Sequence, residues 1–394
     1  MSVENMNAIV EIRAELPVQV ESSLCSRFRC TKLQCAACAI VCPVPGAVRF
    51  VEQGVEITEV CVACGACASA CPNGALRLLE SDRRLAERIR DRVRPAAAFR
   101  IACTRAEGRA DVVLPCLSRL TEAIVLEPIR GGAARVELLD PGCSGCGLKK
   151  AAPQWKKVLM FSRDICESAG FGVDRVARVS VPSGKPEETR GRSTSPNPRR
   201  AMFRAIAERW KASGAPVLQE GEPEQTPAEP FRDVVQRHHE NPKRSDLLEM
   251  LPSLPGVKLR SKVISAAGTP LADLEVNRHC VGCNVCETLC PVGALRHREE
   301  KGTYALEFDS ALCTGCRVCE AVCFYQAIRV RETVDLSVLF ERPRVTLISA
   351  PRRTCQTCGG TYLDGSSEFC SLCQLSGSRR DAVARRFFSG GITK

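Results

Sequence analysis

The spacing of its cysteines constrains this chain more than any other feature. The 394 residues include 26 cysteines, most of them two or three residues apart. Disulfide frameworks belong to oxidising compartments, whereas such short spacings are typical of thiolates that must reach one metal centre. We expect a cytoplasmic protein, because residues 1–21 contain no signal sequence and no stretch approaches the roughly 18 to 20 apolar residues of a transmembrane segment. The cysteines therefore predict metal sites in place of disulfides.

Four groups of four cysteines have the spacing of iron–sulfur ligands. Three of the groups read C-x2-C-x2-C-x3-C, and a proline follows the last cysteine of the first three groups. Three cysteines at this spacing can hold one face of a cubane, while the fourth is carried by the next turn to a partner cluster. Structural zinc is the alternative, but two tandem pairs of the pattern favour iron and sulfur. The groups are Cys30, Cys35, Cys38 and Cys42; Cys61, Cys64, Cys67 and Cys71; Cys280, Cys283, Cys286 and Cys290; and Cys313, Cys316, Cys319 and Cys323.

The two pairs of groups each resemble a bacterial ferredoxin with two [4Fe-4S] clusters. Each of the first three groups is followed by a matching Gly-Ala stretch, at Gly46, Gly74 and Gly293. The resemblance implies interleaved ligands, so that each cluster takes three cysteines from one group and the last cysteine of the partner group. The implied sets are Cys30, Cys35, Cys38 and Cys71 (first set); Cys61, Cys64, Cys67 and Cys42 (second set); Cys280, Cys283, Cys286 and Cys323 (third set); and Cys313, Cys316, Cys319 and Cys290 (fourth set).

Two departures from the ferredoxin pattern bear on these sets. Four residues, in place of two, separate Cys30 from Cys35, and Cys25 is close enough in sequence to replace Cys30 as a ligand. Longer openings occur in ferredoxin-like electron-transfer subunits of larger oxidoreductases, so we still expect a cubane there. In the fourth group, Phe324 stands where the pattern has proline, which changes the following turn but not the ligands.

The segment between the two pairs of groups has the pattern of a small parallel α/β unit. Residues 110–115 and 134–139 are short apolar runs typical of buried strands, and residues 118–129 and 151–169 have helical character. The β-α-β-α order predicts a parallel sheet, which binds ligands at the carboxyl ends of its strands. Three of the segment's four clustered cysteines fall just beyond such ends. The four are Cys103, Cys116, Cys143 and Cys146 (middle set).

This middle segment also resembles the small iron–sulfur delta subunit of methyl-viologen-reducing hydrogenases that work with heterodisulfide reductase. The matching features are Pro115-Cys116, Arg119-Leu120 and the Cys143 and Cys146 pair in a glycine-rich turn. The resemblance implies a [2Fe-2S] cluster on the middle set. Two alternatives stay open: a redox-active pair of thiols at Cys143 and Cys146, or ordinary core packing. We expect Cys166, on a helical pattern with apolar neighbours, to serve in packing alone.

The remaining segments predict a linker and a metal-binding ribbon. Residues 182–265 are polar and rich in proline and charge, apart from a short amphipathic helix expected at 201–212. Near the C-terminus, the pattern C-x2-C-x11-C-x2-C is typical of two knuckles around a tetrahedral ion. We expect structural zinc there, with a single rubredoxin-like iron as the alternative, followed by a basic tail at 379–394. The zinc ligands are Cys355, Cys358, Cys370 and Cys373 (ribbon set).

Together these patterns predict an α+β protein in which two ferredoxin-like 2[4Fe-4S] domains flank a small α/β unit, with a C-terminal zinc ribbon. The formal net charge of +11 falls to near zero when four cubanes and one zinc site, each about −2 with their thiolates, are counted. We therefore expect no nucleic-acid partner. The expected domains are 1–95 (first ferredoxin-like domain), 96–181 (α/β unit), 182–265 (linker), 266–335 (second ferredoxin-like domain) and 345–394 (zinc ribbon and tail).

Electron transfer is the function that these patterns favour. No dinucleotide fingerprint, Walker loop or radical-SAM cysteine pattern occurs in the sequence. We predict a non-catalytic electron-transfer subunit of an anaerobic cytosolic oxidoreductase. Its expected partners, in a hetero-oligomer, are a catalytic subunit (a hydrogenase, molybdenum enzyme or flavin reductase) and a second redox carrier. The alternative is a stand-alone reductase whose middle unit reduces a disulfide or small molecule, through Cys143 and Cys146 or an accessible cluster.

Overall fold

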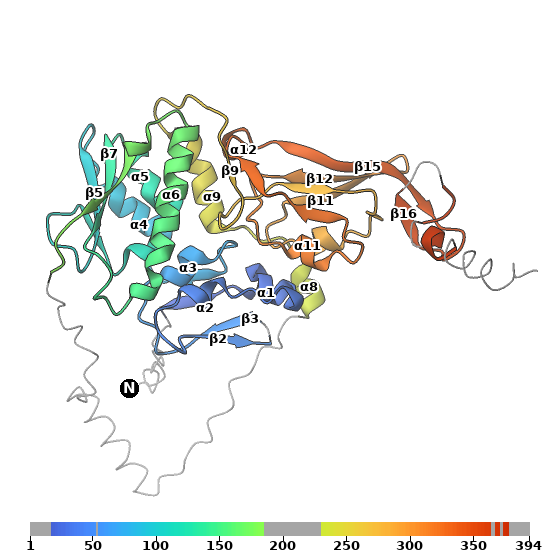
Figure 1. Cartoon of the computed structure of the whole chain (residues 1–394), viewed down its shortest axis with the longest axis horizontal. Coiled ribbons are helices and arrows are strands. Elements are labelled where there is room, and N and C mark those ends of the chain that lie inside the picture. The colour runs from blue at the N-terminus through green and yellow to red at the C-terminus, as the bar shows by residue number, and fades with distance from the viewer. Residues whose placement is uncertain (1–16, 53, 185–229, 364–366, 371–372, 378–394) are drawn as a thin grey trace, which may run out of the picture.

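The described chain forms an elongated body made of three units and a small C-terminal lobe. In the computed structural model of Figure 1, the parallel α/β unit lies at one end, the N-terminal cysteine-rich unit lies next to it, and the second cysteine-rich unit leads to the lobe. Among the described residues, no helix combines the length and the apolar character needed to cross a bilayer. The helix expected at 201–212 and the basic tail at 379–394 lie outside these residues. The structure describes residues 17–52, 54–184, 230–363, 367–370 and 373–377.

The N-terminal unit contains short helices between two antiparallel strand pairs. Strand β1 pairs with β4, and β2 forms a hairpin with β3. Helices α2 and α3 each carry the third cysteine of a group, Cys38 and Cys67, so the two halves of the unit repeat one design. The elements are β1 (Val18–Val20), η1 (Ser22–Leu24), α1 (Ser26–Arg29), η2 (Thr31–Leu33), α2 (Ala37–Val41), β2 (Val48–Val51), β3 (Gly54–Ile57), α3 (Ala66–Ala70) and β4 (Leu76–Leu78).

The middle unit is a four-stranded parallel sheet with helices packed against it. The strand order is β6-β5-β7-β8, and each neighbouring pair is parallel. The strands expected at 110–115 and 134–139 correspond to β6 and β7, and the expected helices correspond to α5 and α6. Strands β5 and β8 complete the sheet. The elements are α4 (Asp82–Arg90), β5 (Ala98–Cys103), β6 (Val112–Leu114), η3 (Leu117–Arg119), α5 (Glu122–Arg130), β7 (Arg135–Asp140), η4 (Lys149–Ala151), α6 (Ala152–Ser168), η5 (Val173–Arg175) and β8 (Val176–Ser180).

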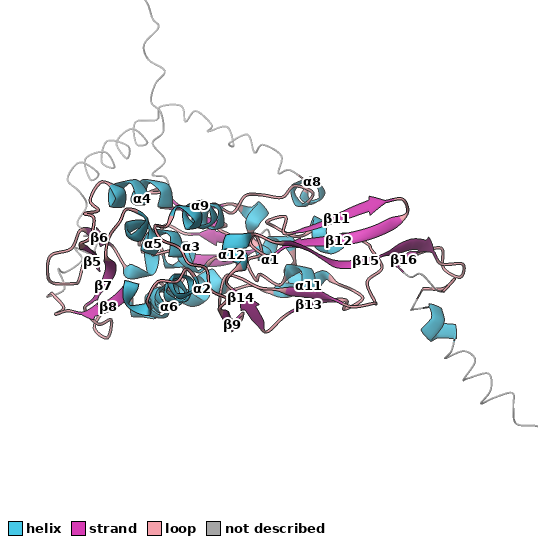
Figure 2. Cartoon of the chain, turned by 90° about the horizontal axis from the view of Figure 1, so that it is seen from above, coloured by secondary structure: helices cyan, strands magenta, loops and turns pink. Residues whose placement is uncertain are grey.

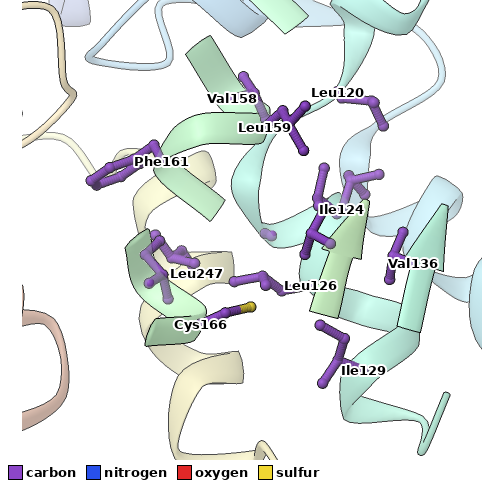
Figure 3. Close-up of a cluster of buried hydrophobic side chains, with 14 of the residues drawn as sticks. Leu120, Ile124, Leu126, Ile129, Val136, Val158, Leu159, Phe161, Cys166 and Leu247 are labelled. Atoms are coloured by element: carbon purple, nitrogen blue, oxygen red, sulfur yellow. The ribbon is translucent and has the colours of Figure 1, made fainter. Parts of the chain in front are cut away.

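The largest hydrophobic core is centred on this middle unit and continues into the second cysteine-rich unit. Figure 3 shows Ile124 of α5, Val136 of β7 and Leu159 of α6 among its buried side chains. Full burial of each aliphatic side chain contributes about 1.5 to 3 kcal/mol. Cys166 of α6 also belongs to this core, and burial raises the pKa of its thiol to about 12. It therefore packs as a small apolar side chain.

Residues 230–265, expected to be part of a linker, are folded in the structure. Leu247, Leu248 and Met250 of α9 are buried in the core of the middle unit, and this burial outweighs the polar composition of the segment. Asn241 caps α9 by accepting a hydrogen bond from the Arg244 backbone N–H. The segment thus ties the middle unit to the second cysteine-rich unit. Its elements are α8 (Phe231–Val235), α9 (Pro242–Met250), η6 (Leu251–Ser253) and β9 (Val263–Ser265).

The second cysteine-rich unit repeats the plan of the first and adds a long hairpin. Strand β10 pairs with β13, and β9 pairs with β14. The hairpin of β11 and β12 is extended by β15 and β16 into a four-stranded antiparallel sheet that leads into the C-terminal lobe, as Figure 2 shows. The elements are β10 (Leu274–Val276), α10 (Val285–Thr288), β11 (Leu295–Glu300), β12 (Thr303–Asp309), α11 (Val318–Val322), β13 (Ile328–Val330), β14 (Thr333–Asp335), α12 (Val338–Glu341), β15 (Arg344–Thr354) and β16 (Thr361–Leu363).

Candidate iron–sulfur centres

Three hollows in the cysteine-rich units are each lined by four cysteines that come from two different groups. Counting all space between the lining atoms, open solvent included, the hollows measure about 320, 370 and 350 Å³. The cysteines are those of the second set, Cys42, Cys61, Cys64 and Cys67; the fourth set, Cys290, Cys313, Cys316 and Cys319; and the third set, Cys280, Cys283, Cys286 and Cys323.

Tight turns bring the thiols and backbone N–H groups of each set together. Gly65, just before α3, has φ +78°, a left-handed conformation that glycine adopts without strain. At the last cysteine of two groups, the backbone donates to sulfur: Ala75 N–H to Cys71 Sγ at 3.3 Å, and Ala327 N–H to Cys323 Sγ at 3.2 Å. Hydrogen bonds of this kind stabilise a thiolate and raise the reduction potential of a cluster that it holds.

Burial makes these converging thiols unfavourable as free anions. It is the first cause that raises the pKa of Cys38 to about 12 and of Cys64 to about 11, and it raises the pKa values of Cys67 and Cys319 as well. Metal ligands bind as thiolates, so a cationic iron core would supply the positive charge that four buried sulfurs require. The number of thiols in each hollow and their donor chemistry together fit a [4Fe-4S] cluster.

The first set gathers around Cys38, with one more thiol close by than a cubane needs. After burial, the thiols that raise the pKa of Cys38 are those of Cys71, Cys35 and Cys25, in that order. Cys25 and Cys71 also belong to one small apolar cluster. Cys30, at the other end of α1, is only 6% exposed and precedes η2, which packs against α11 of the second unit. Two cysteines are therefore candidates for the remaining ligand, and the observed contacts favour Cys25.

The middle set converges at one edge of the parallel sheet. Cys103 ends β5, Cys116 follows β6, and the pair Cys143 and Cys146 follows β7, at the edge where such sheets bind ligands. Burial raises the pKa of Cys143, and Asp140 and the other three thiols of the set act in the same direction. The four thiols thus lie within electrostatic range of one another. This donor set fits a small iron–sulfur cluster.

The four sulfur atoms of the ribbon set lie closer together than those of the other cysteine sets. Among the described residues, this set alone has four sulfurs all within 4.8 Å of one another. The Cys358 and Cys370 sulfurs lie 3.8 Å apart, and ligands around a tetrahedral zinc with Zn–S bonds of about 2.3 Å are separated by about 3.8 Å. Backbone N–H groups, that of Cys370 foremost, lower the pKa of Cys355 to about 6. The set fits one tetrahedral ion bound by thiolates.

Comparison with known families agrees with the chemistry of the two cysteine-rich units. The family described as 4Fe-4S binding domain matches residues 55–77, and the family described as 4Fe-4S dicluster domain matches residues 279–327. The chain carries ferredoxin-type 4Fe-4S domains. They indicate an iron–sulfur electron-transfer protein. A search of curated proteins found no match.

The first ferredoxin-type domain contacts the middle unit at the second set. Cys64 and Cys116, one from each unit, share an apolar cluster with Ala151, and the charge of Cys116 helps to raise the pKa of Cys64. A Cβ on Gly65 would come within 2.9 Å of the Arg119 Cβ, so glycine is required for this close approach. The second and middle sets are therefore neighbours.

The first and fourth sets meet where the two ferredoxin-type domains join (the junction). Asn73, two residues beyond Cys71, accepts a 2.5 Å hydrogen bond from the Thr314 hydroxyl and donates at 2.8 Å to the Ser26 Oγ. Ser26 in turn hydrogen-bonds to Cys316, which lowers the pKa of that thiol against the larger effect of burial. A chain of three polar side chains thus connects a ligand segment of each domain.

The third set lies between the fourth set and the ribbon set. Burial raises the pKa of Cys319, a member of the fourth set, and Cys286 of the third set adds to the rise. On the other side, Tyr325 lies near Cys283 of the third set and near Cys370 and Cys358 of the ribbon, all of which raise its pKa after burial does. The spatial order is thus middle, second, first, fourth, third and ribbon.

Proposed function

We propose that the chain is an electron-transfer subunit that relays electrons through four [4Fe-4S] clusters and one [2Fe-2S] cluster. The 4Fe-4S domains and the three cysteine-lined hollows support the cubanes. The convergence of Cys103, Cys116, Cys143 and Cys146 at one sheet edge supports the fifth cluster. When bound, these centres accept and donate single electrons, while the chain positions them, excludes water and adjusts their potentials.

The unbroken order of the cysteine sets is the observation that carries this proposal. Each set contacts the next through a ligand or a residue near one: Cys64 and Cys116 for the second and middle sets, and Asn73 and Thr314 for the first and fourth. An electron that enters at either end can move between centres without leaving the protein.

The two ends of the line are the proposed docking points for partners. Cys283 of the third set is exposed, and the cysteines of the middle set are partly exposed. We assign a catalytic oxidoreductase subunit to one end and a second redox carrier to the other, in a cytoplasmic hetero-oligomer. The ribbon set, beside the third set, takes structural zinc in this proposal, because its sulfur spacing matches a single ion.

Metal analysis of anaerobically purified protein tests this function. We expect about 16 iron atoms per chain from the cubanes, or about 18 with the [2Fe-2S] cluster, and one zinc. After reduction with dithionite, low-temperature paramagnetic resonance should show signals from reduced clusters. A preparation with zinc in the cysteine groups and little iron would refute the proposal.

A further inference from the structure

Three basic side chains surround the junction without a carboxylate partner. Within the described residues, Arg29, Lys243 and Arg244 form no ion pair with an acidic side chain and instead donate to main-chain carbonyls. Arg29 and Arg244 are only 2% and 5% exposed. Burying a cation with no anion nearby is costly. Glu122 acts on Arg244 electrostatically without forming an ion pair, and clusters on the neighbouring sets would add negative charge beside all three cations.

Lys243 of α9 approaches the first set. Its ammonium group donates to the carbonyls of Ser69 at 2.6 Å, Cys71 at 3.0 Å and Ala68 at 3.2 Å. These carbonyls lie at the end of α3, where a cation also interacts favourably with the helix dipole. Its charge lowers the pKa of Cys71, against the larger effect of burial. Lys243 is therefore held within a few ångströms of a ligand of the first set.

Arg244 and Arg29 approach the fourth set from two sides. Arg244 donates to the Pro270 carbonyl through Nη2, while its buried Nη1 has no hydrogen-bond partner among the described residues. Its electrostatic partners are Glu122 and, with a smaller effect, Cys313 of the fourth set. Arg29 donates through its three nitrogens to four carbonyls, and its electrostatic partners are Cys290 and Cys316 of the fourth set.

Basic side chains beside the second and third sets are paired with carboxylates. Arg119, which packs against the second set, forms an ion pair with Asp82 at 2.8 Å. Arg352, which donates to the Gly282 carbonyl beside the third set, forms an ion pair with Glu299 at 2.9 Å. The N-terminus of α9 and the end of α1 thus concentrate basic groups on the inner two sets. Two anionic clusters that meet at the junction would also repel each other, and these cations would offset the repulsion.

We propose that Lys243, Arg244 and Arg29 raise the reduction potentials of the first and fourth clusters above those of the second and third. The inference rests on the proposed function, because it requires cubanes on both inner sets. One-electron reduction of a cubane adds a negative charge, and a fixed cation in a poorly solvated site stabilises the reduced form more than the oxidised form. An electron arriving from either end would therefore be held at the junction before it moves on.

The test compares cluster potentials in three variants of the full chain. Lys243→Gln removes the charge, Lys243→Arg keeps it, and Lys157→Gln removes a charge on the exposed face of α6. Iron content is measured first. Each cubane is then titrated with dithionite under paramagnetic resonance. In Lys243→Gln we expect the first cluster to shift to a more negative potential, with the second and third unchanged. Lys243→Arg should retain the original potential, and Lys157→Gln should change nothing.

A second variant, Arg244→Met, should shift the fourth cluster in the same direction. Arg244 is buried and its loss can destabilise the fold. The decisive measurement therefore uses the variants of the partly exposed Lys243. Full iron content with unchanged potentials in Lys243→Gln would overturn the inference. Inner clusters more negative than the outer ones in the unmodified protein would also overturn it. Absence of cubane signals in the unmodified protein would instead refute the proposed function.

Discussion

At the scale of single residues, the ligand sets depend on a few positions that the spacing leaves undecided. The fourth ligand of the first set is the clearest case. A regular motif would place it at position 32, which is Lys32, so Cys25 and Cys30 both remain candidates from the sequence. The fold brings Cys25 next to Cys38 and Cys71, whereas Cys30 lies at the other end of the single turn of α1.

We expect Cys25→Ala to lose the first cluster and Cys30→Ala to retain it. The reason is that Cys25 lies among the other thiols of the set, whereas Cys30 precedes η2, which faces α11. Iron content should fall by about 4 atoms in the first variant, with loss of one cubane signal in paramagnetic resonance. Cys166→Ala is the matched control: it should keep all iron and cost about 1 kcal/mol of stability through a small cavity. Normal iron in Cys25→Ala would assign Cys30 instead.

At the scale of elements, local periodicity predicted most of the helices and strands beside the cysteines of the middle unit. It did not predict the helices that connect this unit to the second ferredoxin-type domain. The patterns at 110–115 and 134–139 became β6 and β7, but β5, which carries Arg100 in its middle and ends at Cys103, was not expected. Helix α9 was missed because its polar residues dominate the composition of its segment. Its leucines are buried only by contact with a distant core, and such tertiary contacts cannot be read from local sequence.

The thiols at the strand ends provide a test of the alternative enzymatic reading. Cys143→Ala should remove about 2 iron atoms and the [2Fe-2S] signal, because the four thiols of the middle set converge on one site. Turnover of disulfides or small molecules by the isolated chain, with a chemical reductant, should be absent or equal in the variant and the parent. A reductase activity that disappears with Cys143 would support catalysis by the middle unit.

Asp246 of α9 should make the stability of the protein depend on pH. Burial, followed by the charges of Asp82 and Glu249, raises the pKa of Asp246 to about 6 from an ordinary value of 3.8. Because the folded state binds this proton more tightly, stability should decrease as pH rises from about 4 to about 6 and then level off. Asp246→Asn should remove that decrease and stabilise the protein at pH 7 by about 1 kcal/mol, after discounting for solvent screening. Chemical denaturation at pH 5 and pH 7 measures the difference, and equal gains at both values would contradict it.

At the scale of the whole molecule, the arrangement of the units could not be predicted from the cysteine patterns. The ferredoxin-type domains were predicted from their motifs, and the family matches confirm them. Their order in space depends on contacts such as Asn73 with Thr314, which are 241 residues apart in the chain. No periodicity or spacing signals a pairing of that kind. The order of the cysteine sets is therefore a property of the tertiary structure alone.

The hydrogen bonds at the junction should hold the two ferredoxin-type domains together and so stabilise the fold. Asn73→Ala removes hydrogen bonds to the Leu24 carbonyl, to Ser26 and from Thr314, all buried. Unsatisfied partners cost about 1 to 3 kcal/mol each, so we expect a loss of about 3 kcal/mol. Thr314→Val, which removes one of these bonds, should lose about 1 kcal/mol. Thermal unfolding of the iron-loaded protein checks both, and equal effects would argue against a junction centred on Asn73.

Residues far apart in the sequence enclose the junction, and they are therefore synthesised at different times. Arg29 is made early, yet three of the four carbonyls that it binds belong to Val235, Arg237 and Thr288. A growing chain on the ribosome therefore leaves one side of its earliest cysteines uncovered until those later residues emerge. Delivery of iron and sulfide to the first domain has that interval in which to occur, before folding of the second domain closes the route.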